Sequence, residues 1–357
     1  MDDIRHGGDI YRHAVELDFS VNENPFGMPE GVRQALADAV AQCRHYPDPQ
    51  AQELTEALAR KYGIRRENLL FGNGASELFM AIVHALQPRR ALLPVPSFAG
   101  YEHVLKAVRS EVRYYPLREE TQFCLDAGIL AELRSVELLF LAQPNNPVGN
   151  LMDRAFLEKL LDACMEKGIY VVLDECFLEL CPEGEKASFV RDIERYPKLM
   201  VVRAFTKTYG IPGVRLGYLV CEKELLALVR RQLPEWNVSV PAQAAGMAAL
   251  REDVYLTTCV AQLQMLRQTL CEQLRELGLT VYEGSGNFIL CKSDLPLYEA
   301  LLQRKILIRD CANYKGLERG YYRIAVRRPE ENGRLLQAIR KIREEMGSAP
   351  TCQGENG

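Results

Sequence analysis

The middle of the chain carries three short apolar segments that are separated by more polar sequence. VELLFLA (136–142), IYVVLDE (169–175) and LMVVRAF (199–205) are dense in Val, Leu and Phe, as strands covered on both faces are. Between the first two, DRAFLEKLLDACMEKG has helical spacing, with Asp153 as its candidate N-cap and Gly168 placed to end it. Because strand–helix–strand units form right-handed crossovers, this pattern predicts an α/β domain with a largely parallel sheet.

The sequence beyond about residue 222 has a different pattern. A long helical stretch leads to SGNFILCKS, ILIRDC and YYRIAVR, which resemble the strands of a smaller α+β unit. A chain of 357 residues also exceeds a single typical domain. We therefore predict an N-terminal arm across both domains (1–30), a large α/β domain (31–245), a small C-terminal α+β domain (246–347) and a polar tail that we expect to be disordered (348–357).

Composition argues against several classes of partner. The chain is 48% hydrophobic, and its net charge of −4 gives no electrostatic reason to expect nucleic acid or an anionic membrane. No apolar run approaches the roughly 20 residues that span a bilayer, and the opening MDDIRHGGDIY lacks the features of a secretory signal. The eleven cysteines form no CxxC pair, so we assign no metal site and expect a reducing, cytoplasmic location.

Two polar segments follow predicted strands. In GNGASELF, Gly72 and Gly74 allow close backbone approach, and Ser76 opens an amphipathic helix whose exposed amides would attract an anion. Ser76 can also be a simple helix cap. In QPNNPVGN, Asn145 and Asn146 follow the first strand, where they either face a ligand or form an ordinary proline turn.

Three charged residues lie at the end of a predicted strand or in the segment after one. Asp174 ends the second strand, where it either caps the next helix or meets a buried cation, since an isolated buried carboxylate is costly. AFTKTYGIPGVRLGY (204–218) follows the third strand and contains Lys207 and Arg215. Lys207 is either a solvated loop lysine or a catalytic amine. Ligands of α/β folds bind at the carboxyl ends of strands, so these groups are candidates for one site.

Together these features fit the cofactor pyridoxal 5′-phosphate. Its aldehyde needs an amine, its pyridine nitrogen an anion, and its phosphate needs amides, hydroxyls and a guanidinium. Asp174 would keep the ring nitrogen protonated. A lysine that is partly desolvated among other cations has a lowered pKa and is the better nucleophile. We therefore predict that Lys207 is the catalytic amine.

Seven motifs, in order along nearly the whole chain, are similar to those of fold-type I pyridoxal-phosphate enzymes of the histidinol-phosphate aminotransferase branch: NENP, YPDP, GNGASE, PNNPVG, DECF, TKTYGIPGVRLGY and YYRIAVR. Within that branch, the opening HGGDIYRHAVELDFSVNENPFGMP and the later RKILIRDCANYKGLERGYYRIAVR resemble the threonine-phosphate decarboxylases. Those enzymes convert L-threonine O-3-phosphate into CO2 and (R)-1-amino-2-propanol O-2-phosphate for the nucleotide loop of cobalamin. Aminotransferases of the branch usually lack the HGG opening.

The resemblance implies a set of cofactor contacts. Lys207 would bind the aldehyde covalently, and Asp174 would pair with the pyridine nitrogen. Asn146 would hydrogen-bond the 3′ oxygen, and Phe98 would stack on the ring. Tyr46 of YPDP would reach the cofactor phosphate from the other subunit of a homodimer. Within its own subunit, the phosphate would be held by Ser76, Thr206, Arg215 and the amides of Gly74 and Ala75.

The resemblance also implies substrate contacts. Arg323 matches the arginine that binds the substrate α-carboxylate, and Asn24 lies near the same group. A guanidinium suits a phosphate well, so the candidates for the substrate phosphate are Arg309 first, with His6 of the arm and Arg327 behind it. Arg327 can instead belong to a solvated pair of arginines, and His6 can be an exposed terminal residue.

Four positions need separate attention. Phe177 stands where the aminotransferases usually carry Tyr, whereas the decarboxylases resemble this sequence in having Phe. Ala204 stands where relatives often have Ser, so one hydroxyl for the cofactor phosphate is missing. Cys176 follows DE at a position of small residues, and Cys311 is near the expected substrate pocket. We interpret both thiols as packing groups rather than nucleophiles.

We expect decarboxylation of L-threonine O-3-phosphate, with Lys207 returning a proton to Cα. Phosphoserine stays open as a substrate, because one missing methyl group gives only about 1–3 kcal/mol of discrimination. The first alternative is a histidinol-phosphate or related amino acid aminotransferase that uses 2-oxoglutarate. The second is a catalytically idle module that binds the cofactor as a sensor or scaffold.

Overall fold

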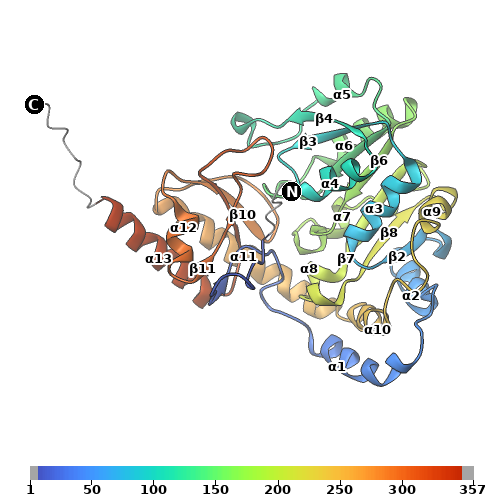
Figure 1. The fold of residues 1–357 in the computed structure, drawn as a ribbon, viewed down its shortest axis with the longest axis horizontal. Helices are drawn as coiled ribbons and strands as arrows, with labels where there is room; N and C mark the ends of the chain where they lie inside the picture. The colour runs from blue at the N-terminus through green and yellow to red at the C-terminus, as the bar shows by residue number, and fades with distance from the viewer. Residues whose placement is uncertain (1–6, 348–357) are drawn as a thin grey trace, which may run out of the picture.

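The computed structural model describes residues 7–347 and divides them into a large and a small domain (Figure 1). His6 and the tail 348–357 therefore lie outside the described residues. The large domain is built on a seven-stranded sheet in the order β2 (Leu69–Gly72), β8 (Gly217–Cys221), β7 (Leu199–Ala204), β6 (Tyr170–Asp174), β5 (Leu138–Ala142), β3 (Arg90–Val95), β4 (Glu111–Pro116). Only β8 runs antiparallel to its neighbours, so the predicted largely parallel sheet is confirmed.

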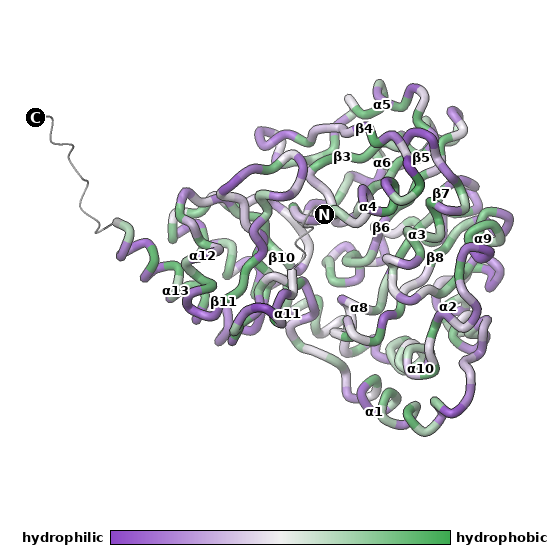
Figure 2. The backbone as a smooth tube through the Cα atoms, viewed as in Figure 1, coloured by the Kyte–Doolittle hydropathy of each residue, from purple (hydrophilic) through white to green (hydrophobic). Residues whose placement is uncertain are grey.

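Helices cover both faces of this sheet (Figure 1). They are α1 (Glu30–Ala39), η1 (Val40–Arg44), α2 (Gln52–Tyr62), η2 (Arg66–Asn68), α3 (Ala75–Leu86), α4 (Ala99–Ala107), η3 (Glu119–Thr121), α5 (Ile129–Glu132), α6 (Arg154–Glu166), η4 (Leu178–Leu180), α7 (Gly184–Ala187), α8 (Phe205–Thr208), η5 (Pro212–Val214), α9 (Lys223–Arg230) and α10 (Val240–Ala249). Successive strand residues enter opposite cores: Val171 and Leu173 pack on one face, and Val172 packs on the other. Figure 2 shows apolar segments running through the strands that separate these cores.

The predicted helix between β5 and β6 is present as α6. The carboxylate of Asp153 accepts a hydrogen bond from the N–H of Phe156 (2.8 Å), which satisfies one of the free amides of the first turn. Gly168 follows the helix with a φ of 72°, a left-handed conformation that favours glycine. Both end signals that the sequence suggested are confirmed.

The small domain contains an antiparallel sheet in the order β12 (Arg309–Asp310), β13 (Tyr321–Ala325), β10 (Phe288–Lys292), β9 (Thr280–Val281). Three helices pack with it: α11 (Asp253–Glu276), α12 (Leu297–Leu302) and α13 (Pro329–Gly347). The predicted boundary at residue 245 falls inside α10. Ala242, Ala245 and Ala249 of that helix all pack in the core of the large domain, so the whole of α10 belongs there.

The arm contacts both domains, as the sequence suggested. Its strand β1 (Leu17–Asp18) pairs in parallel with β11 (Ile306–Leu307) of the small domain. The backbone N–H of Asn24 donates to the carbonyl of Lys207 in the large domain (3.0 Å). The arm therefore connects the small domain to the segment that carries the predicted catalytic lysine.

A hydrophobic interdomain cluster joins the two domains on another side. It consists of Leu117, Phe123 and Val148 from the large domain, and Tyr282, Leu290, Cys311, Tyr314 and Tyr321 from the small domain. At its edge, the carboxylate of Glu119 accepts hydrogen bonds from Tyr282 and Tyr321, and Lys292 forms an ion pair with it (3.0 Å). Across residues 7–347, no helix is long and apolar enough to cross a membrane.

Candidate active site

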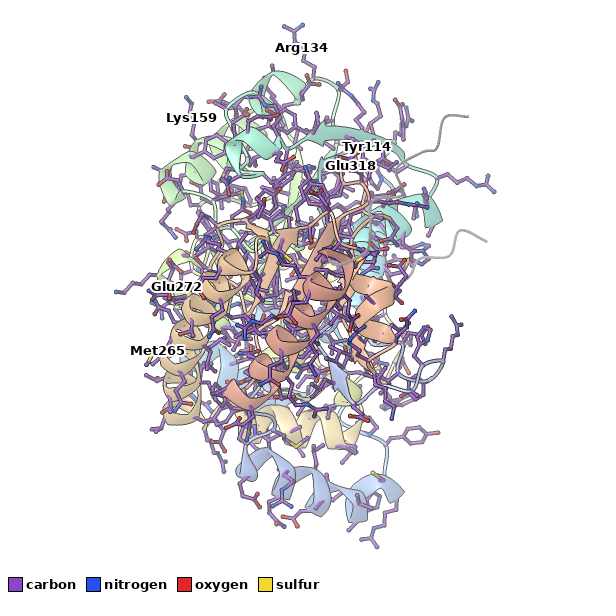
Figure 3. The ribbon with its side chains drawn as sticks, turned by 90° about the vertical axis from the view of Figure 1, so that its left-hand side faces the viewer. Tyr114, Arg134, Lys159, Met265, Glu272 and Glu318 are labelled. Atoms are coloured by element: carbon purple, nitrogen blue, oxygen red, sulfur yellow. The ribbon has the colours of Figure 1, made fainter. Side chains whose placement is uncertain are left out.

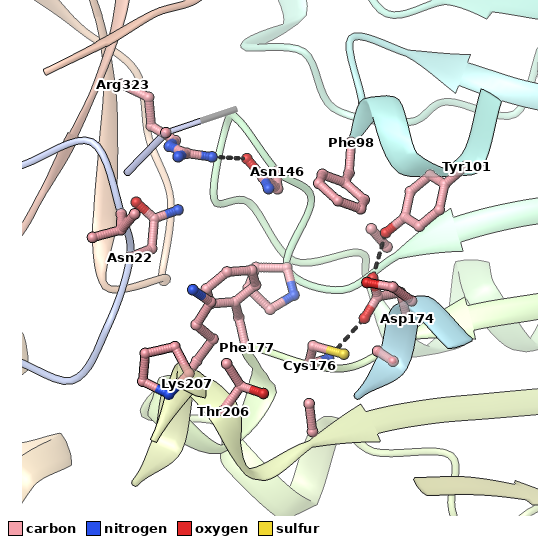
Figure 4. A pocket seen from close by; sticks show the side chains of 18 of the residues that line it. Asn22, Phe98, Tyr101, Asn146, Asp174, Cys176, Phe177, Thr206, Lys207 and Arg323 are labelled. Carbon is pink, nitrogen blue, oxygen red and sulfur yellow. Dashed lines mark hydrogen bonds between the residues drawn. The ribbon is translucent and has the colours of Figure 1, made fainter. Parts of the chain in front are cut away.

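A pocket of about 270 Å³ lies between the two domains at the carboxyl ends of the central strands (Figure 4). The large domain forms one wall, and the arm and small domain form the other. We call these the cofactor wall and the substrate wall. The predicted residues that line the pocket are Ala75, Ser76, Phe98, Asn146, Asp174, Thr206, Lys207, Arg215, Arg309 and Arg323.

Lys207 extends into the pocket from α8, directly after β7 (Figure 4). Burial lowers the pKa of its amine to about 8; Glu23 opposes this shift, while Arg323 and Arg215 add to it. A larger share of the amine is therefore uncharged near neutral pH than for an exposed lysine. This is the state in which an amine attacks an aldehyde.

Asp174 ends β6 on the same wall. Its carboxylate accepts hydrogen bonds from the hydroxyl of Tyr101 (2.5 Å) and from the N–H of Cys176 (2.9 Å). Burial raises the pKa of Asp174, and hydrogen bonds from the Cys176 side chain, the Tyr101 hydroxyl and the Cys176 backbone act against that increase. Within residues 7–347 no side chain forms an ion pair with it, so a protonated ring nitrogen would supply the missing positive partner.

The start of α3 forms a cradle for an anion. Gly74 precedes this 12-residue helix with a φ of 78°, and a Cβ there would lie 2.3 Å from Nη2 of Arg215. Gly217 is equally confined, because a Cβ would lie 2.7 Å from the amide nitrogen of Ala75. Glycine at both positions thus lets the guanidinium approach the amides of the first turn. Ser76 and Thr206 line the same pocket, so this cradle fits a phosphate.

The substrate wall brings two arginines to the pocket. From β13, Arg323 donates to the side-chain oxygen of Asn146 (2.6 Å) and to the carbonyl of Ser20 (2.7 Å), while its buried Nε has no partner. Arg309 from β12 donates to the carbonyl of Asp310 (2.7 Å) and stacks over the ring of Tyr314. Each guanidinium therefore retains donors for an anionic ligand.

Asn24 is not brought to this pocket. Its buried amide donates to the carbonyl of Thr208 (2.8 Å) and accepts from the N–H of Phe26 (3.0 Å), which fixes the arm against the large domain. Asn22, two residues earlier, lines the pocket instead, and its side-chain oxygen is buried without a partner. The structure therefore corrects the position of Asn24 and points to Asn22.

Arg327 also lies away from the pocket. The strand β13 ends at Ala325 and the chain turns into α13, so the guanidinium of Arg327 reaches back to the carbonyl of Asp18 in the arm (2.5 Å). It is neither a pocket residue nor a solvated residue, because it anchors the arm. Tyr46 is 80% exposed and packs against the ring of Trp236, so its role in a partner subunit stays a prediction.

Sequence reasoning missed Tyr101, although a signal was available. Phe98 and Tyr101 are three residues apart at the start of α4, a spacing that places them on one face of a helix. The two cysteines behave as predicted. Burial raises the pKa of the Cys176 thiol well above its usual range, and Cys311 packs in the interdomain cluster. In the described part of the chain, no His, Cys, Asp and Glu side chains group as metal ligands do.

The residues of the cofactor wall fit pyridoxal 5′-phosphate. A buried amine, an unpaired carboxylate and a phosphate cradle lie on adjacent strand ends, and Phe98 borders the same space. The fold and this site together define a pyridoxal-phosphate enzyme of fold type I.

Comparison with known proteins identifies the family. The aminotransferase class I and II family model matches residues 14–339. Threonine-phosphate decarboxylase of Salmonella typhimurium is 38% identical over 351 residues, covering 94% of this chain and 96% of the relative. Histidinol-phosphate aminotransferase 2 of Archaeoglobus fulgidus is 36% identical over 330 residues, covering 91% and 93%. The chain therefore belongs to the aminotransferase class I and II family.

The similar solved structures also include a decarboxylase and an aminotransferase. L-threonine-O-3-phosphate decarboxylase of Porphyromonas gingivalis has a TM-score of 0.81 and 28% identity, covering 93% of this chain and 98% of that one. Histidinol-phosphate aminotransferase of Clostridium acetobutylicum has a TM-score of 0.87 and 28% identity, covering 92% and 99%. Relatives named for two different reactions, decarboxylation and transamination, are thus similar to this chain along nearly its whole length.

Proposed function

We propose that the protein decarboxylates L-threonine O-3-phosphate to CO2 and (R)-1-amino-2-propanol O-2-phosphate, the latter for the nucleotide loop of cobalamin. The observation that carries this proposal is the presence of two arginines on the substrate wall. Arg323 and Arg309 provide separate guanidinium groups for an α-carboxylate and a phosphate ester. The relative from Salmonella, similar along nearly its whole length, supports the same substrate.

The bound cofactor would supply an electron sink for the bond that breaks at the substrate Cα. Arg323 would bind the α-carboxylate, and Arg309 would hold the phosphate, so the substrate is fixed at both ends. The orientation that these two arginines impose on the substrate would then decide which Cα bond breaks. The amine of Lys207 would carry the proton that returns to Cα after CO2 leaves.

Phe177 supports decarboxylation in preference to transamination. It lines the pocket and packs edge to face with Phe288 (5.2 Å between ring centroids), so it offers no hydroxyl to the cofactor. The 3′ oxygen of the cofactor would then depend on Asn146, whose amide also accepts from Arg323. Asn146 would thereby link the cofactor to Arg323 without a tyrosine.

The test is an incubation of cofactor-loaded protein with L-threonine O-3-phosphate in the absence of any keto acid. Steady release of CO2 and of the amine is the expected result. A parallel incubation with phosphoserine determines whether the missing methyl group matters; we expect turnover of both, with at most about a hundred-fold difference. Absence of CO2 from L-threonine O-3-phosphate would overturn the proposal.

Transamination is the second candidate, and one observation favours it. The histidinol-phosphate aminotransferase of Clostridium acetobutylicum has the higher TM-score of the two solved structures. Its substrate also carries a phosphate ester that Arg309 would bind. Glutamate formed from histidinol phosphate and 2-oxoglutarate, without CO2 from phosphothreonine, would establish this alternative. Silence in both assays with an unaltered cofactor absorption would indicate the idle module.

We also propose a homodimer whose subunits complete each other's sites. Tyr46 and Trp236 form an exposed aromatic pair, 4.8 Å apart between ring centroids, and Tyr46 is absent from the pocket wall of its own subunit. Light scattering of the purified protein should give about twice the mass of one chain. A monomer that keeps full cofactor affinity would contradict this arrangement.

A further inference from the structure

Tyr101 contacts two residues that face the expected cofactor ring. Its hydroxyl donates to Oδ2 of Asp174 over a distance of 2.5 Å (Figure 4). Asp174 is the carboxylate that would meet the ring nitrogen of the cofactor. The ring of Tyr101 packs edge to face against the ring of Phe98 (5.4 Å between centroids, 80° between planes). Phe98 is the residue that would stack on the cofactor ring. Tyr101 on α4 therefore contacts both Asp174, which would meet the edge of the cofactor ring, and Phe98, which would lie against its face.

The surroundings of Tyr101 leave it little freedom. The side chain is 1% exposed, stacks on Phe140 (5.1 Å, 19°) and meets Phe79 at a right angle (5.3 Å, 89°). Burial raises the pKa of its phenol well above the usual range, so the hydroxyl stays a donor at every working pH. A buried donor that cannot ionise gives Asp174 a constant partner.

Gly100 lets Phe98 take its position beside Tyr101. A Cβ at Gly100 would lie only 2.2 Å from Cε1 of the Phe98 ring, so any other residue would force that ring away. The ring of Phe98 thus folds over the start of its own helix and lines the pocket. The short segment 98–101 positions two aromatic side chains as a unit.

We propose that Tyr101 is a positioning residue that couples Asp174 to Phe98, and thereby sets both the affinity for the cofactor and the charge on its ring nitrogen. Without the hydroxyl, Asp174 keeps only the hydrogen bonds from the side chain and N–H of Cys176, and becomes a stronger base. It then draws the shared proton away from the ring nitrogen, which reduces positive charge next to Lys207. This inference needs only cofactor binding and is independent of the proposed reaction.

The experiment compares Tyr101→Phe, Tyr101→Leu and a matched control, Tyr114→Phe. Tyr114 also donates its hydroxyl to a carboxylate, Glu102 of the same helix α4 (2.9 Å), but it does not line the pocket. For each protein, the dissociation constant of pyridoxal 5′-phosphate is measured on the cofactor-free form. The absorption of the bound cofactor is then followed against pH.

Tyr101→Phe should weaken cofactor binding about ten-fold, since it removes one hydrogen bond to a charged group. The pH midpoint of the absorption change, which reports the nitrogen of Lys207, should rise by about half a unit. The charged and titratable groups that act on Lys207 are unaltered in every variant: Glu23, Arg323, Cys176 and Arg215. Tyr101→Leu should weaken binding several-fold further, because Phe98 also loses its neighbour.

Three outcomes would overturn the proposal. Affinity and midpoint of Tyr101→Phe could both match those of Tyr114→Phe, which would mean that the hydroxyl has no influence on the cofactor. Reduced affinity with an unchanged midpoint would mean that the hydroxyl is only structural. Equal affinity of Tyr101→Leu and Tyr101→Phe would overturn the proposed coupling to Phe98, because loss of the Tyr101 ring would then have no effect on cofactor binding.

Discussion

The cofactor wall and the substrate wall are held in place by different means. On the cofactor wall, sheet hydrogen bonds fix the spacing: Asp174 lies opposite Val202 of β7, and Ala204 lies opposite Gly217 of β8. On the substrate wall, Arg323 depends on contacts across the molecule to Asn146 and to the arm. The first wall is therefore set by local strand register, and the second by how two domains and an arm pack together.

The largest effect should come from the cofactor wall. Lys207→Ala removes the buried amine and should lower CO2 release by about a thousand-fold or more. Lys159→Ala, which changes an exposed lysine on the outer side of α6, should stay within about two-fold of the unmodified protein (Figure 3). Turnover is measured as CO2 release at saturating substrate. Appreciable turnover by Lys207→Ala would contradict its assignment as the catalytic amine.

The substrate wall can be probed with two arginines four residues apart. Arg323→Lys keeps the charge but loses the planar pair of donors, so KM should rise about a hundred-fold. Arg327→Lys should leave KM nearly unchanged and lower the melting temperature instead, because its donor fixes Asp18 of the arm. KM and melting temperature are determined for both variants. A raised KM in Arg327→Lys would mean that it does contact substrate.

The pKa of Lys207 predicts how the cofactor is captured. With a pKa of about 8, the uncharged share of the amine rises about ten-fold between pH 7 and 9 and then levels off. The rate at which cofactor-free protein takes up pyridoxal 5′-phosphate should follow that curve in a stopped-flow absorbance experiment. A rate that continued to climb through pH 10 would show that burial does not lower this pKa.

The smallest effect concerns the contact between the two domains at Glu119. Hydrogen bonds from Tyr282 and Tyr321, aided by Lys292, lower the pKa of Glu119 to about 2. Because the folded-state value lies below the unfolded one, this stabilisation is complete above about pH 4.5 and disappears as pH falls toward 2. Glu119→Gln should lower the melting temperature by a few degrees at pH 7 and hardly at all near pH 2. Equal losses at both pH values would exclude the carboxylate charge as the cause.

The two walls also differ in how well the sequence predicts them. Asp174 ends β6, and Lys207 and Gly74 lie two or three residues after β7 and β2, all at one edge of the sheet, where α/β folds place their ligands. Neighbouring sequence therefore predicts this wall residue by residue. The spacing of Phe98 and Tyr101 could have placed Tyr101 beside the pocket, but its hydrogen bond to Asp174, 73 residues further along the chain, has no local signal.

The substrate wall was predicted only in part. Arg323 and Arg309 lie on strands that hold them toward the pocket. Asn24 and Arg327 lie where the chain leaves regular structure, and which way each points depends on contacts of the arm. The segment NEN offered two amides, and only the packing of the arm selects Asn22. Which of the two amides faces the pocket therefore depends on the tertiary structure and not on the local sequence.

The antiparallel strand β8 has a consequence for how this chain tolerates change in length. Lys207 and Arg215 belong to one hairpin whose two strands are locked where Ala204 meets Gly217. The length of the hairpin therefore fixes the distance between the amine of Lys207 and the phosphate cradle. One residue inserted between 207 and 215 would change that distance, whereas an insertion at the exposed turn before α7 would not. The arm and the small domain lie outside this hairpin, so a change of length there would leave the separation of Lys207 and Arg215 along the chain unchanged.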